Sequence, residues 1–299
     1  KDSSINEEID KLRIKASTSL MSRNDVIVIA SVSCIYGVGS PKEYSKLLFA
    51  INKNDCIDSK EFYKSLVNIH YLRNDMVLEP GVFRVRGDVV DIFPIYDEYP
   101  VRMEFFGDEV EKIYTFNPLT GEIIMDLDTM TFYPCKNFVT TDESLKRGIE
   151  LIREELGPRL KYFRNEGKLL EAQRLEQKTL YDIEMMMEMG YCSGIENYSR
   201  HLDVRKEGQR PYCLLDFFPD DFLMLIDESH VSLPQLRAMY NGDRSRKSTL
   251  VEHGFRLPSA LDNRPMKFEE FANKIDRTIY ISATPSDYEL ALSQNNIVE

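Results

Sequence analysis

Residues 223–230 read LMLIDESH, in which four apolar residues run directly into Asp, Glu, Ser and His. A short apolar run of this kind is typical of a strand buried in a parallel sheet, and α/β proteins place their chemistry where such strands end. A second apolar strand with a polar end, TIYISAT, follows at residues 278–284. Strand, crossover and strand together predict an α/β domain.

The first residues of the chain fit the same domain. Residues 5–23 have helical spacing, and DVIVIAS at residues 25–31 predicts a further strand of the parallel sheet. The helix should turn one apolar face inward: Ile5, Ile9, Leu12 and Ala16. We therefore expect residues 1–44 and 211–299 to be two parts of one α/β domain.

Between these parts, residues 45–139 have a different pattern of polar and apolar residues. PKEYSKLLFAINK at residues 41–53 reads as a helical stretch, and short strands follow it. VFRVRG at 82–87 and VRMEFF at 101–106 alternate between two faces, and the Asn-Pro-Leu-Thr-Gly run at 117–121 is a turn signal. This pattern predicts an inserted, small antiparallel β-rich domain.

Residues 140–210 predict an inserted helical subdomain. Gly157-Pro158 should kink or end its first helix, because an internal proline loses a hydrogen bond and clashes with the preceding turn. Gly167 marks a second break before another helix. The methionines of that helix should fill its core: Met185, Met186, Met187 and Met189.

Composition limits the class of protein. The net charge of −12 argues against a surface that binds nucleic acid all over, although a local basic face remains possible. The five cysteines form no C-x-x-C pair and only four histidines accompany them, so a structural zinc site is not expected. Free thiols fit a reducing cytoplasm, and no apolar run reaches the ~18 residues of a membrane span.

The acidic pair at the end of the first strand fits nucleotide hydrolysis. Asp227 could hold Mg²⁺, and Glu228 could orient or deprotonate the attacking water. Acidic residues are also common at strand ends, so the pair alone is a weak signal. The hydroxyls of Ser282 and Thr284 strengthen it, because they could hydrogen-bond His230 or the carboxylates and couple the nucleotide state to movement. Together the two strand ends indicate a RecA-like ATPase domain of helicase superfamily 2.

A nucleotide site of this type also needs a phosphate loop. No G-x-x-x-x-G-K-[ST] occurs in the 299 residues. Most of the affinity for a triphosphate comes from the amides and lysine of that loop. We therefore expect the chain by itself to be inactive as an ATPase and to hold no cofactor.

Several longer stretches resemble the UvrB family, the damage-verifying subunits of bacterial nucleotide excision repair. The resemblance covers the whole chain and is carried by six segments: SVSCIYGVGSPKEY at 31–44, FRVRGDVVDIFP at 83–94, YCSGIENYSRH at 191–201, IDESHVSLPQLRAMYNGDRSRK at 226–247, HGFRLPSALDNRP at 253–265 and YISATPSDYEL at 280–290. Relatives of two of these segments occur in the transcription-repair coupling factor, whose module has a degenerate nucleotide site.

The resemblance implies a cytoplasmic DNA-repair protein of the SOS response. In the UvrB family the phosphate loop lies upstream of the point that matches Lys1, and a second helicase-type domain lies beyond the point that matches Glu299. The chain would then be a middle portion of an excinuclease subunit that uses ATP and Mg²⁺. Its partners would be UvrA, and through the longer protein UvrC and damaged DNA. The alternatives are a module that only binds protein, or the coupling factor.

The arginines of the β-rich segment have three readings. Arg84 and Arg86 lie two apart on one strand face, and Arg102 with Glu104 repeats that spacing on another strand. A solvated polar face is one reading, and a nucleic-acid surface is disfavoured by the interspersed carboxylates. A protein interface suits mixed charge better. The resemblance implies that these residues, with Arg73, bind UvrA.

A second basic cluster follows DESH: Arg237, Arg244, Arg246 and Lys247. In the UvrB family this side of the α/β domain faces the DNA, so the resemblance implies DNA contacts. A solvated helix end is an equal alternative.

Overall fold

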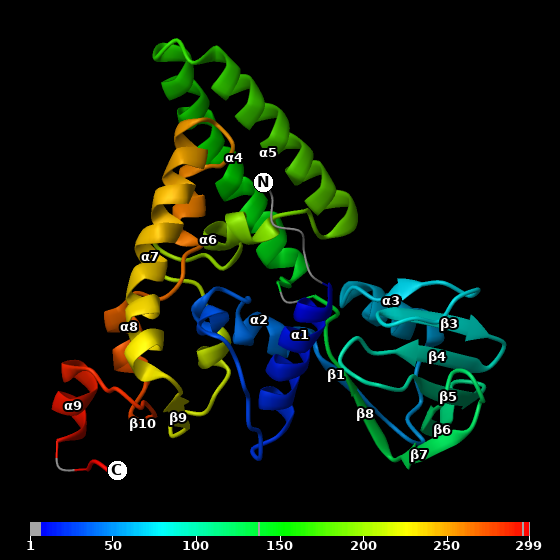
Figure 1. Cartoon of the computed structure of the whole chain (residues 1–299). Helices are drawn as coiled ribbons and strands as arrows, with labels where there is room; N and C mark the ends of the chain where they lie inside the picture. Colours follow the sequence, from blue (N-terminus) through cyan, green and yellow to red (C-terminus); the bar gives the residue numbers. More distant parts are fainter. Residues whose placement is uncertain (1–6, 137, 295, 299) are drawn as a thin grey trace. The chain divides into compact units, whose positions relative to one another are not determined.

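The computed structural model describes residues 7–136, 138–294 and 296–298 (Figure 1). The chain is a mixed α/β protein of two compact units, Lys1–Val28 with Pro41–Thr141 and Ile29–Ser40 with Asp142–Glu299. The predicted first segment, residues 1–44, is therefore divided between the two units.

The first unit is built around a mainly antiparallel sheet. Its elements are α1 (Glu7–Ser22), α2 (Pro41–Leu47), β1 (Phe49–Asn52), α3 (Ser59–Asn68), β2 (Leu72–Arg73), β3 (Val82–Arg86), β4 (Val89–Phe93), β5 (Val101–Phe106), β6 (Glu109–Phe116), β7 (Ile123–Leu127) and β8 (Thr129–Phe132). Strands β2 to β7 pair in chain order, and β1 pairs separately with β8. Only the β2–β3 pair within that sheet is parallel.

The alternation of VFRVRG and VRMEFF gives this sheet one apolar and one polar face. Phe83 pairs with Ile92, and Met103 pairs with Ile113, so that their side chains meet on one side. Helix α3 adds Phe62 to the same core. All five side chains are at most 2% exposed.

The second unit contains a two-stranded parallel sheet and a helical part. Its elements are η1 (Val32–Ile35), α4 (Asp142–Asn165), α5 (Leu169–Met189), η2 (Ile195–Tyr198), α6 (Ser199–Leu202), η3 (Leu214–Asp216), β9 (Leu223–Ile226), α7 (Ser229–Glu252), η4 (Pro258–Asp262), α8 (Phe268–Lys274), β10 (Arg277–Tyr280) and α9 (Asp287–Ser293). Strands β9 and β10 pair in parallel, as the sequence predicts. Their core includes Ile35, Ile226, Leu233 and Met266.

Two predictions about the elements of the N-terminal part are wrong. Residues 25–31 form no strand, and Ile27 and Ile29 are more than 90% exposed, because this stretch joins no ladder in the described part of the chain. The helix expected over 41–53 ends at Leu47, since pairing of β1 with β8 overrides local helical spacing.

Helix α1 also turns a different face inward. Ile9 and Leu12 are exposed, whereas Ile14 and Thr18 are buried. Ile14 packs against Tyr44 and two further tyrosines of the same unit. The other predicted member of the inward face, Ile5, lies outside the described residues.

The helix expected to kink or end at Gly157-Pro158 does not end there. Helix α4 contains Pro158 and continues to Asn165, because its apolar stripe continues through Leu160 and Phe163 and packing offsets the lost hydrogen bond. The expectation for the methionines is wrong in part. Among the methionines of α5, Met186 is fully buried, but Met187 and Met189 are each more than 60% exposed and fill no core.

Candidate functional site

The strand-end turn of residues 227–230, called the DESH turn below, connects β9 to α7. The Oδ1 atom of Asp227 accepts a hydrogen bond of 3.0 Å from the backbone N–H of Glu228. The Ser232 hydroxyl donates to the Asp227 carbonyl at 2.8 Å, which closes the first turn of α7. Both carboxylates lie exposed at the positive end of this helix dipole, a favourable place for negative charge.

The structure brings the DESH turn and the predicted hydroxyl segment together. Ser282 Oγ lies 2.8 Å from His230 Nδ1. The same Ser282 oxygen accepts a 3.1 Å hydrogen bond from the backbone N–H of Thr284, so Thr284 takes part through its backbone rather than its hydroxyl. The Oε2 atom of Glu228 lies 3.5 Å from His230 Nδ1. His230 Nδ1 therefore lies near both Glu228 and Ser282.

Three residues that the sequence analysis missed complete this region. Ser229 Oγ donates to Glu289 Oε1 at 2.8 Å. The second oxygen of Glu289 accepts from Ser286. Ser-x-x-Glu before a helix is the capping-box pattern, so the spacing of Ser286 and Glu289 was a usable signal for the start of α9. It did not indicate that Glu289 reaches the DESH turn.

The donor set is compatible with a magnesium ion shared with a nucleotide. Within the ranges that the structure describes, no three side chains of the His, Cys, Asp or Glu type converge to form a metal cage. Magnesium usually takes one or two protein carboxylates, and phosphate and water oxygens fill the rest of its shell. The exposed Asp227 carboxylate can supply one such ligand.

On the polar face of the sheet, two of the predicted partner-binding arginines are engaged internally. Arg84, Asp91 and Arg102 occupy directly paired positions on β3, β4 and β5. Asp91 is 2% exposed and accepts from Arg84 Nε at 2.7 Å, from Arg102 Nε at 2.6 Å and from Arg102 Nη2 at 3.0 Å. The hydrogen bond to Asp91 raises the pKa of Arg102. Arg84 is therefore paired within the sheet, and its side chain is 17% exposed.

The remaining members of that set lie nearer the solvent. Arg86 is exposed, and its Nη2 atom makes one 3.3 Å contact with the Asp75 carbonyl. Arg73 pairs with the Asp75 carboxylate at 3.0 Å. Glu104 accepts a 2.6 Å hydrogen bond from Tyr114, which is the main cause that lowers the pKa of Glu104. Arg73 and Arg86 are thus the two exposed residues of the five.

The basic cluster on α7 also separates into two kinds of residue. Arg244 and Arg246 are exposed. Arg237 stacks on the rings of Phe268 and Tyr288, with its Cζ atom 4.2 and 4.8 Å from their centroids.

Lys247 differs from these three arginines. It is buried and pairs with Asp243 at 2.9 Å, and it also donates to the Asn263 carbonyl. Burial lowers the pKa of Lys247 despite the adjacent carboxylate. The placement of Lys247 on an exposed basic surface is therefore wrong, and it acts in packing.

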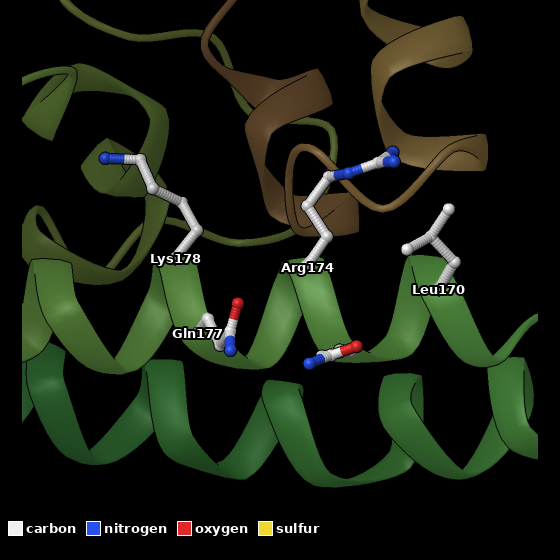
Figure 2. A pocket seen from close by; sticks show the side chains of 5 residues that line it. Leu170, Arg174, Gln177 and Lys178 are labelled. Atoms are coloured by element: carbon white, nitrogen blue, oxygen red, sulfur yellow. The ribbon is translucent and has the colours of Figure 1, made fainter.

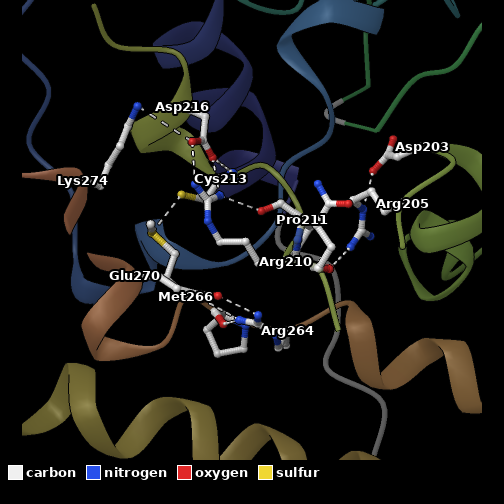
Figure 3. Close-up of polar contacts among 12 residues, drawn as sticks. Asp203, Arg205, Arg210, Pro211, Cys213, Asp216, Arg264, Met266, Glu270 and Lys274 are labelled. Atoms are coloured by element: carbon white, nitrogen blue, oxygen red, sulfur yellow. Dashed lines mark hydrogen bonds and ion pairs between the residues drawn. The ribbon is translucent and has the colours of Figure 1, made fainter. Parts of the chain in front are cut away.

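Other arginines of the second unit form structural forks (Figure 3). Arg210 makes two hydrogen bonds to Asp216, at 2.6 and 2.8 Å, and Arg264 makes two of 2.7 Å to Glu270. Arg205 is buried and bonds Asp203 at 3.2 Å. The two bidentate pairs are local, one within the loop that precedes β9 and one at the start of α8. Arg264 Nη2 also donates to the Gly208 carbonyl at 3.0 Å, which joins the two segments.

A surface hollow lies along α5 (Figure 2). Leu170, Gln173, Arg174, Gln177 and Lys178 line it. Arg174 points across to the end of α7, where its Nη1 atom donates to the His253 carbonyl at 2.7 Å. The hollow contains none of the predicted catalytic residues.

Among the described residues, no helix has both the length and the apolar character needed to cross a membrane.

Comparison with known proteins gives a consistent result. A family model of the UvrB interaction domain matches residues 49–138, and one of the UvrB third helical domain matches residues 143–204. The "UvrABC system protein B" of Bacillus licheniformis is 60% identical over 291 residues, which are 97% of this chain and 44% of that protein. The proteins of the same name from Enterococcus faecalis and Gemmatimonas aurantiaca are 59% and 54% identical. They cover 97% and 100% of this chain, which in turn covers 44% and 43% of their lengths. The chain thus spans less than half the length of these relatives.

Proposed function

Because this chain belongs to the UvrB family, we propose that it is the central part of an ATP-dependent subunit of a DNA excinuclease, one that verifies damage in nucleotide excision repair. The chain would supply two activities to that protein. The second unit supplies half of the ATPase site, within a RecA-like helicase-type domain. The first unit docks the partner protein UvrA. UvrC and damaged DNA bind to the longer protein.

The observation that carries the ATPase proposal is the contact between the DESH turn and the end of β10. Asp227 would hold Mg²⁺ with the nucleotide, and Glu228 would orient the attacking water. Bound magnesium would neutralise phosphate charge. His230 reports the state of the site to β10, because its ring is hydrogen-bonded to Ser282 at 2.8 Å. Thr284 holds the Ser282 oxygen in place through its backbone N–H.

The observation that favours docking is the match of residues 49–138 to the UvrB interaction domain. The exposed Arg86 and Arg73 make the direct contacts with UvrA in this proposal. Arg84 and Arg102 contribute by fixing the sheet on which Arg86 is displayed, since both bind the buried Asp91. Glu104 adds mixed charge at the same face.

DNA contact is assigned to the exposed arginines of α7. Arg244 lies about one turn beyond Tyr240 on α7, and Arg246 lies two residues further along. Arg237, on the same helix, stacks on Phe268 of α8 and Tyr288 of α9. Their guanidinium groups can bind phosphate without reading sequence.

The decisive experiment for the ATPase proposal uses the full-length protein with its phosphate loop. Glu228→Gln keeps the size of the side chain and removes its base. Nucleotide should still bind, while turnover should fall by roughly 10²-fold or more. Glu252→Gln, at the far end of the same helix and exposed, is the matched control and should retain turnover. Wild-type turnover in Glu228→Gln would remove Glu228 from the mechanism.

A further inference from the structure

The backbone at Glu228 is held in an unusual conformation. Its φ and ψ are 44° and 51°, which is the left-handed region. A residue with a Cβ atom is disfavoured there, because that atom comes too close to the following carbonyl oxygen. Such a conformation persists only where neighbouring contacts determine it, and it is often found at functional sites.

The next residue, Ser229, is fixed through both its backbone and its side chain. Its backbone N–H donates to the carbonyl of Ile281 at 3.0 Å, which ties it to the end of β10. Its Oγ atom donates to Glu289 Oε1 at 2.8 Å, which ties it to α9. Ser229 is completely buried, so water does not compete for either bond. With residue 229 immobilised, the chain leaving β9 at Ile226 has only two residues in which to enter α7.

Glu289 is the less usual member of this pair. Its exposed fraction is 1%. Its two oxygens accept from the hydroxyls of Ser229 and Ser286. Burial of a carboxylate is unfavourable unless it is hydrogen-bonded, and one oxygen of Glu289 accepts its hydrogen bond from the DESH turn. The contact with Ser286 joins two side chains and caps no backbone N–H of α9, so the start of that helix does not explain why Glu289 is buried.

We propose that Glu289 is a positioning residue for the ATPase reaction. Its carboxylate clamps Ser229, and the clamped Ser229 keeps Glu228 in the left-handed turn that aims its carboxylate at the attacking water. This inference rests on the proposed function of the DESH turn. It makes the segment after β10 part of the catalytic apparatus, in addition to the His230–Ser282 contact.

The test measures steady-state hydrolysis of MgATP by the full-length protein, together with thermal unfolding. Ser229→Ala and Glu289→Ala should each lower kcat about tenfold and leave KM unchanged, because the turn loses its constraint but the phosphate loop is untouched. The double variant should be no worse than either single one, since both remove the same hydrogen bond. Glu289→Gln should recover most of kcat, because its amide oxygen can accept from Ser229. Asp287→Ala, exposed on the same helix, is the matched control and should keep kcat.

Two results would overturn the clamp. One is a kcat within twofold of wild type in Ser229→Ala. The other is a double variant whose loss equals the product of the two single losses, which would mean independent effects. If Glu289→Ala does not fold, Ser229→Ala alone still decides the matter, because the clamp requires its kcat to fall. Glu228→Gln, measured in parallel, separates the two proposals. If Glu228→Gln is inactive and Ser229→Ala has normal kcat, only the clamp is refuted. If Glu228→Gln is fully active, the proposed ATPase role itself is refuted.

Discussion

Replacement of Asp91 by alanine should strongly destabilise the first unit. Asp91 is 2% exposed and lies between two guanidinium groups on neighbouring strands. Without its carboxylate, Arg84 and Arg102 lose three short hydrogen bonds and face each other with like charge. Removal of one partner from a buried ion pair typically costs ~3–5 kcal/mol.

The partial exposure of the arginines reduces that figure. The side chain of Arg84 is 17% exposed and that of Arg102 is 28% exposed, so water can solvate part of the freed charge. We therefore expect the free energy of unfolding of the first unit to fall by about 3 kcal/mol in Asp91→Ala.

The assay is urea unfolding of the chain, followed by far-UV circular dichroism and tyrosine fluorescence. Lys112→Ala is the control, because its ion pair with Glu104 is more than half exposed on the lysine side and should change nothing measurable. Joint replacement of Asp91, Arg84 and Arg102 by apolar residues of similar size should recover much of the stability, since no charge is then stranded. A loss below about 1 kcal/mol in Asp91→Ala would refute the reasoning.

Three further predictions concern pH, backbone space and activity. Burial raises the pKa of Asp97 to about 6, above its ordinary value of 3.8. The stabilising contribution of this carboxyl is complete below pH 3.8 and is lost as pH rises through 6. The unfolding free energy of wild type minus that of Asp97→Asn should therefore fall by about 1–3 kcal/mol over that window, and a flat difference would contradict the burial. Gly254→Ala should lower the thermal stability of the second unit, because φ is +71° and a Cβ atom would meet the Glu171 carbonyl oxygen at 2.4 Å. Gly242→Ala should instead stabilise α7 in thermal unfolding, because a Cβ atom there has no other atom within 4 Å. The 299-residue chain alone should show no ATP turnover in a phosphate-release assay, because it lacks the phosphate loop; a steady rate abolished by Glu228→Gln would contradict this.

Local patterns predicted β3 and β5 of the first unit, because alternation fixes which side chains share a face. They could not predict that Arg84 is internal. That result depends on the register that places Asp91 between two arginines, and register is a property of strand pairing.

The two strand ends of the second unit were predicted to meet because parallel strands place their carboxyl ends at one edge. The distance of 2.8 Å between His230 and Ser282 agrees with that geometric expectation. Glu289 escaped prediction because α9 brings it back to the DESH turn, and its tertiary position leaves no periodic signal. The strand expected at residues 25–31 failed for the opposite reason, since an apolar run without a partner ladder forms no strand.

The central claim is that the first unit displays a docking face for UvrA. The most direct test is a calorimetric titration of this chain with purified UvrA. Wild type should bind saturably, and Arg86→Glu should weaken binding about tenfold or more while the chain stays folded. Arg244→Glu, an equal charge reversal on the second unit, should leave the affinity for UvrA unchanged. No saturable binding by the wild type, or equal affinity in Arg86→Glu, would contradict the account.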